Sequence, residues 1–258
     1  MKRIALIAVA ALIALAVAAS PASAILSVQK FSAVVKPAKA GTKKKPQAVS
    51  LSANPYFDTN APDLDNQVQF ATVNANVFFP KGGVYNGKYF PACAPSTVFQ
   101  DEKQCPKGSR VGTADGFGKG LGLDESVKGQ FFNVPGGKGT TLLVTGESPL
   151  IIREIVNSTL TTLSDPDYSY KLSFSVPRNL QSPAPGVIAS VMKFNSTIPV
   201  QYVTKGKGKK KKKIPLLATN SCPPSGLWKF KYIADYTTTF DSAIESSQTV
   251  ETTQKCTK

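Results

Sequence analysis

Residues 228–240 read WKFKYIADYTTTF, and this stretch indicates the fold class more clearly than any other part of the chain. Alternate positions from its first residue are aromatic or apolar: Trp228, Phe230, Tyr232, Ala234, Tyr236 and Phe240. The positions between them are largely polar: Lys229, Lys231, Asp235, Thr237 and Asp241. Apolar side chains at every second position are typical of a strand with one buried and one solvated face. The stretch therefore predicts a long β-strand.

The same alternation recurs along the chain. It is clear over residues 168–176, and over residues 68–79 its phase slips in a way that predicts a β-bulge near Thr72. Residues 150–163 also fit a strand, with a helix as the alternative. The remaining predicted strands cover residues 26–35, 48–53, 140–147, 187–197, 199–204 and 247–256. We therefore expect an all-β protein with little helix: an antiparallel β-sandwich, immunoglobulin-like or jelly-roll-like, over residues 25–258. Two smaller sandwiches are the alternative.

The first 24 residues have the composition of a secretory signal peptide. Lys2 and Arg3 precede an apolar run over residues 4–19, and small residues occupy positions 22 and 24. This pattern predicts export and cleavage after Ala24. The run is too short for a comfortable membrane span, and no second apolar stretch of about 18 residues follows. We expect a secreted or cell-envelope protein without a transmembrane segment in its mature form.

Four cysteines fit an oxidising compartment. They are Cys93, Cys105, Cys222 and Cys256, and four cysteines allow three connectivities. We favour Cys93–Cys105 and Cys222–Cys256, because each pair brackets a plausible local loop or hairpin.

The conventional catalytic and metal-binding patterns are absent from the sequence. A chain without histidine cannot use a Ser-His-Asp or Cys-His arrangement. Residues 112–122 are glycine-rich, but Gly120 follows Lys119 where a phosphate loop needs Ser or Thr, so we expect a flexible or bulged connection there. The polar cluster Asp58, Asn60, Asp63, Asp65 and Asn66 predicts a turn, with a Ca²⁺ site as the alternative. We predict no catalytic residue, cofactor or metal, and expect no enzyme.

The net charge of +15 comes from short segments. Lys2 and Arg3 leave with the signal peptide, five lysines lie within residues 36–45, and seven lie within residues 205–213. Without these fourteen, 17 basic residues face 16 acidic ones, so the remaining body is nearly neutral.

The lysine segments carry the only direct indication of a binding partner. The candidate polyanion-binding residues are Lys43, Lys44, Lys45, Lys209, Lys210, Lys211, Lys212 and Lys213. Clustered lysines attract anionic cell-wall polymer, acidic polysaccharide or anionic lipid surfaces, and such binding weakens with salt. Neither run contains the aromatic residues needed for base stacking, so we expect no specific nucleic-acid binding. The alternative is that these lysines only keep a β-rich protein soluble.

Several motifs together resemble one group of proteins. They are PAKAGTKKKP at 37–46, KYFPAC at 88–93, CPKGSRVGT at 105–113, and the closing Cys222-Pro223, Trp228 and Cys256. The set is similar to uncharacterised exported actinobacterial proteins that carry a KAGTKKKP turn, a CPKGSKVG-like segment and a C-terminal strand pair ending in cysteine. The resemblance covers most of the mature chain, implies an extracellular β-protein and supports the two cysteine pairings. It implies no activity. We expect a non-enzymatic structural or binding protein; a carbohydrate-binding or carbohydrate-active protein is the alternative.

Overall fold

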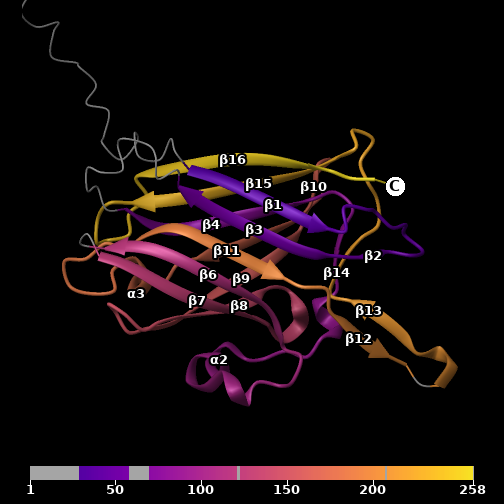
Figure 1. Cartoon of the computed structure of the whole chain (residues 1–258), viewed down its shortest axis with the longest axis horizontal. Helices are drawn as coiled ribbons and strands as arrows, with labels where there is room; N and C mark the ends of the chain where they lie inside the picture. The colour runs from indigo at the N-terminus through magenta and orange to yellow at the C-terminus, as the bar shows by residue number, and fades with distance from the viewer. Residues whose placement is uncertain (1–28, 58–69, 121–122, 207, 258) are drawn as a thin grey trace, which may run out of the picture.

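Antiparallel strands dominate the structure, and eleven of those described share one sheet (Figure 1). The computed structural model describes residues 29–57, 70–120, 123–206 and 208–257. In hydrogen-bonded order the strands are β1 (Gln29–Lys36), β3 (Ser50–Phe57), β11 (Ser190–Ile198), β6 (Arg110–Gly120), β7 (Leu123–Asn133), β8 (Thr140–Gly146), β9 (Ile152–Thr162), β10 (Tyr168–Ser175), β4 (Ala71–Pro80), β15 (Leu227–Thr237) and β16 (Ser246–Lys255).

The two edges of this sheet come together, so the sheet is nearly closed. An odd number of antiparallel strands leaves the first and last strands, β1 and β16, running in the same direction. No backbone ladder joins them over their length. Instead, the Gln254 side chain donates to Val35 O at 2.8 Å and accepts from Val35 N at 2.7 Å. A single parallel bridge between Lys39 and Thr257 continues this seam beyond the strands.

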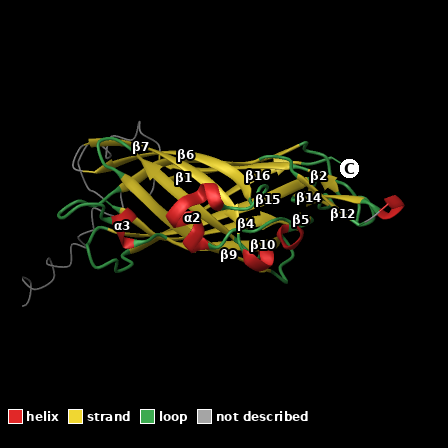
Figure 2. Ribbon diagram, turned by 90° about the horizontal axis from the view of Figure 1, so that it is seen from below, coloured by secondary structure: helices red, strands yellow, loops and turns green. Residues whose placement is uncertain are grey.

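Short elements cover the ends and one outer face (Figure 2). A three-stranded sheet of β2 (Gln47–Ala48), β14 (Leu217–Thr219) and β5 (Gly83–Tyr85) lies beside a hairpin of β12 (Tyr202–Lys205) and β13 (Lys212–Pro215). Among the described residues, the α-helices are α2 (Pro95–Asp101) and α3 (Arg178–Gln181). The 3-10 helices are η2 (Gly87–Tyr89), η3 (Glu102–Gln104), η4 (Pro135–Gly137) and η5 (Gly208–Lys210).

The molecule therefore has two distinct ends. We call the end with β2, β14 and β5 the plugged end; the β12–β13 hairpin also projects there (Figure 1). We call the opposite end the α3 end. It contains α3, the turn between β8 and β9 over residues 147–151, and the loop between β15 and β16 over residues 238–245.

The main hydrophobic core lies along the seam. The inward positions of β15 include Trp228, Phe230 and Ala234, none of which is exposed to solvent. Across the interior, the ring of Phe31 in β1 stacks on that of Tyr232 in β15, with centroids 5.3 Å apart. The alternation seen in the sequence thus becomes one continuous apolar inner face.

The all-β, antiparallel prediction with little helix is confirmed. Strand β15 covers residues 227–237, and residues 152–162 form strand β9 rather than a helix. The bulge lies where the sequence indicated it: Asp235 pairs with Asn74 and Tyr236 with Thr72, which leaves Val73 without a partner residue on β15. Phe240 lies beyond the strand and is exposed.

One prediction was wrong. The glycine-rich segment from Gly112 is no flexible connection, because residues 110–120 form β6, which pairs with β7 and β11. The sequence interpretation also omitted β7 and the short helix α2. The predicted signal peptide and the Asp/Asn cluster at 58–66 lie outside the described residues. No helix in the described part of the chain has the length and apolar character needed to cross a membrane.

Candidate functional site

An apolar cavity of about 460 Å³ lies inside the nearly closed sheet. Ten of the eleven strands line it: all but β16 contribute side chains, and β5 and β14 add others from the plugged end. Its walls are mostly Val, Leu, Ile and Phe side chains, such as Val144, Leu142, Phe194 and Leu172. Successive side chains of a strand point to opposite faces of the sheet. Most side chains on the inner face of these strands are apolar, and they form the lining of the cavity.

Glycines in β6 bring neighbouring strands close at one wall of the cavity. A Cβ atom on Gly116 would lie 2.7 Å from Val127 Cγ2, and one on Gly118 would lie 2.8 Å from Ser190 O. A methyl group at either position would collide with its neighbour. Close packing of the strands therefore requires glycine at these two positions of β6.

Glu125 contributes the one carboxylate among the described residues that line the cavity. It is 9% exposed, and it shares the inward face of β7 with Val127 and Phe131. Its Oε2 accepts a hydrogen bond from Leu150 N at 3.0 Å, whereas its Oε1 has no partner among the described residues. Gly146 leaves room for the carboxyl group, because a Cβ there would lie 2.6 Å from Oε1.

The side chain of Asn133 at the plugged end, in contrast, has hydrogen-bond partners for both its oxygen and its nitrogen. This residue is 1% exposed, and its Nδ2 donates to the carbonyl oxygens of Gly87 and Pro91, each at 3.0 Å. Its Oδ1 accepts from the Tyr85 hydroxyl at 3.1 Å. Burial raises the pKa of Tyr85 to about 12, because the ionised phenolate would lose its hydration. The network ties β5 and η2 to the end of β7.

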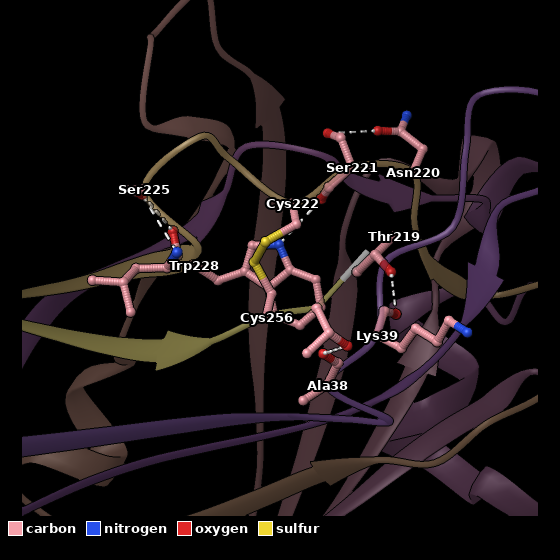
Figure 3. Close-up of a disulfide and its surroundings, with 11 residues drawn as sticks. Ala38, Lys39, Thr219, Asn220, Ser221, Cys222, Ser225, Trp228 and Cys256 are labelled. Carbon is pink, nitrogen blue, oxygen red and sulfur yellow. Dashed lines mark hydrogen bonds between the residues drawn. A yellow bond between two sulfur atoms is a disulfide. The ribbon is translucent and has the colours of Figure 1, made fainter.

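Both predicted disulfides brace this end. The structure joins Cys93 to Cys105 and Cys222 to Cys256, and no cysteine in the described residues is free. Figure 3 shows the second bond beside Trp228, whose indole Nε1 donates to Ser221 O at 3.2 Å. The disulfide thus holds the last residues of the chain against the segment that leads into β15.

The two lysine clusters also lie at the plugged end, one in the loop between β1 and β2 and the other on the β12–β13 hairpin (Figure 1). Lys43, Lys44 and Lys45 are exposed, as are the four lysines at 210–213. None of these seven forms an ion pair within the described residues. The backbone of Lys209 lies in η5. The clusters thus form solvated, uncompensated positive charge at one end.

The sequence therefore located the cysteines and lysines but not the cavity or Glu125. A charged residue on the inward face of a strand is the signal that could have found Glu125, and it was lost because β7 was not predicted. The described residues contain no group of three Cys, Asp or Glu side chains placed to hold a metal ion. No protein-family model matches the chain, and no curated protein or solved structure is significantly similar to it.

Proposed function

We propose that the chain is an exported, non-enzymatic binding protein that carries an apolar molecule inside its nearly closed sheet. The cavity of about 460 Å³ is the observation on which the proposal depends. Ligand sites have volumes of about 300–1,000 Å³ and are lined mostly by apolar side chains. The cavity has both properties.

A cavity of this size requires an explanation, because protein interiors are close-packed and contain few voids larger than a water molecule. Water gains few hydrogen bonds against an apolar wall, so such cavities stay dry and accept apolar ligands. Each buried methylene group of a ligand contributes about 0.8 kcal/mol. A flexible hydrocarbon chain is therefore the ligand class that fits best.

Export is supported by the signal-like first 24 residues and is compatible with the two disulfides. The cavity also favours binding over carbohydrate chemistry. A glycosidase of the usual kind needs two carboxylates flanking its substrate. The described lining of the cavity offers one, Glu125.

We also infer that the nearly closed sheet is flattened into two layers along its seam, as in a sandwich. The Phe31–Tyr232 stack supports this form, as does the edge contact between Phe57 and Tyr236, whose centroids are 5.9 Å apart. Both contacts join strands that are not hydrogen-bonded neighbours. Away from the seam, β6 to β9 would then diverge from the opposite strands and enclose the cavity.

Titration with the apolar fluorophore N-phenyl-1-naphthylamine tests the proposed function. We expect saturable binding to the folded protein, lost in Val144→Trp because the indole would fill the cavity. Val34→Trp is the matched control, because Val34 lies on the outer face of β1 and is exposed. Absence of binding to the wild-type protein, or equal binding by both variants, would contradict the proposal.

A second binding activity is favoured by the lysine clusters. We propose that Lys43–Lys45 and the lysines at 209–213 hold the protein on anionic wall polymer or acidic phospholipid. Lys43–Lys45 and Lys210–Lys213 support this, because they are exposed, lie at the same end and form no ion pair within the described residues. Cosedimentation with phosphatidylglycerol vesicles should occur at low salt and decrease as the Debye length shortens toward about 8 Å. Replacement of both clusters by Gln should abolish it; undiminished binding would mean that the lysines serve solubility.

A further inference from the structure

We propose that the cavity selects an amphiphile, a hydrocarbon chain ending in a hydrogen-bond donor such as an ammonium or hydroxyl group, and that Glu125 binds this polar end. The inference rests on the proposed function, since it names the chemical class of the ligand. Its basis is a buried carboxyl oxygen that has no donor among the described residues and lies at one end of an apolar cavity.

The fold positions Glu125 for this role. Leu123, Glu125, Val127 and Phe131 all line the cavity, so the glutamate occupies an inward position of β7. It lies two residues after the start of the strand, and the start of β7 is at the α3 end. The polar group is therefore at one end of the cavity, and the apolar walls extend from it toward the plugged end.

One half of the carboxyl group is held by the protein and the other half is open. Leu150 N donates to Oε2 and fixes the orientation of the group, while Oε1 lacks a donor among the described residues. Burial of a polar atom without a hydrogen bond is unfavourable, and a donor supplied by a ligand would remove that penalty. Gly146 keeps the space beside Oε1 free of a side chain.

The neighbouring charges do not favour an acidic ligand. Lys119 also lines the cavity, but its Nζ lies 3.6 Å from Asp124 Oδ1 in a pair whose side chains are more than half exposed. That lysine is directed to solvent by its partner on β7. A carboxylate head group would meet Glu125 with like charge, whereas an ammonium group would form a charge-assisted hydrogen bond with it.

Displacement of N-phenyl-1-naphthylamine by dodecylammonium, dodecanol and dodecanoate tests the inference. These compounds share one chain length and differ at the polar end. For the wild-type protein we expect dodecylammonium to bind roughly tenfold or more tightly than dodecanoate, as expected for a charge-assisted hydrogen bond. In Glu125→Gln the preference should fall to about twofold or less, while dodecanol binding changes little, because the amide oxygen accepts from Leu150 N and the amide NH2 donates to the hydroxyl oxygen of dodecanol.

Glu147→Gln is the matched control, because Glu147 is exposed on the turn after β8 and does not line the cavity. It should keep the wild-type preference. Gly146→Ala is a second variant, which should also reduce the preference by displacing the Glu125 carboxyl group. It keeps the test valid if Glu125→Gln does not fold.

The outcomes separate the two proposals. If neither the fluorophore nor any of the three compounds binds, the proposed function fails. If all three bind equally, or if dodecanoate binds best and loses that advantage in Lys119→Gln, the cavity is a binding site but the role of Glu125 is wrong. An unchanged preference in both Glu125→Gln and Gly146→Ala would also overturn the inference.

Discussion

The two ends of the molecule are built on different principles. At the plugged end, two disulfides, a three-stranded sheet and the Asn133 network tie the elements together, and the lysine clusters are exposed to solvent. At the α3 end, Glu125 Oε1 lacks a described partner, and large apolar side chains are exposed at the start of β7 and in the turns. These exposed residues are Leu123, Ile151, Phe240 and Ile244.

This difference between the two ends distinguishes residues that stabilise the fold from residues that are candidates for ligand binding. Satisfied hydrogen bonds and close packing are what stability alone requires. An interior void, and a buried carboxyl oxygen without a donor among the described residues, lower stability, so their presence points to a ligand. The plugged end thus supplies stability and surface charge, and the other end supplies the candidate ligand site.

Loss of the disulfides should have the largest effect on stability. Cys222 and Cys256 are 34 residues apart in sequence, and Cys93 and Cys105 are 12 apart. By the loop-entropy model, Cys222→Ser/Cys256→Ser should lower the free energy of unfolding by about 4 kcal/mol and Cys93→Ser/Cys105→Ser by about 3 kcal/mol. Urea unfolding without reductant measures both. A larger loss from the shorter loop would contradict this order.

A larger side chain should destabilise the protein more at the plugged end than beside the cavity. Val111 is fully buried against Phe90 and Leu216 at the plugged end, whereas Val144 borders the cavity. Val111→Trp should destabilise the protein by roughly 1–3 kcal/mol because the core has no room for it. Val144→Trp should cost less, because its indole enters empty space. Equal costs in thermal or urea unfolding would mean that the cavity is not open in solution.

Alkaline pH should weaken the plugged end through Tyr85. The folded pKa of about 12 lies above the value near 10 of an unfolded tyrosine, so the neutral hydroxyl contributes stability that is complete below pH 10 and is lost as pH rises toward 12. Tyr85→Phe should be about 1 kcal/mol less stable than wild type at pH 8, since it lacks the hydrogen bond to Asn133. This difference should shrink at pH 11. A difference that grows with pH would contradict the assignment.

Neutralising the lysine clusters should have the smallest effect on stability. Replacement of Lys43–Lys45 and Lys210–Lys213 by Gln should change the free energy of unfolding by less than about 0.5 kcal/mol, because these exposed residues form no ion pair within the described structure. Urea unfolding of wild type and variant at equal ionic strength is the measurement. A loss of several kcal/mol would assign the lysines a structural role at the plugged end.

The sequence predicted those parts of the fold whose side chains alternate. Strand β15, the bulge at Val73 and the disulfide pairs follow from period-two patterning and cysteine spacing. Strand β6 was missed because one of its faces consists of Gly112, Ala114, Gly116, Gly118 and Gly120, which carry little or no side chain to reveal a period. Helix α2 has seven residues, too few for a helical pattern.

The cavity could not be predicted from the sequence, for a different reason. Alternation predicts that Val127, Leu142 and Val144 face inward, but not whether the side chains from opposite walls meet. That depends on how far the walls stand apart, which is set by the closure of the whole sheet. Glu125 could be recognised only after β7 had been placed and its inward positions were known.

The Gln254 amide at the seam has a consequence for how this protein behaves in a crowded solution. Unpaired edge strands invite a second chain to extend the sheet, which leads to aggregation. Through one N–H and its oxygen, the two groups that a peptide also offers, the amide occupies both backbone groups of Val35 on β1. A single side chain thus takes the place that a strand from another molecule would occupy at this point of the edge.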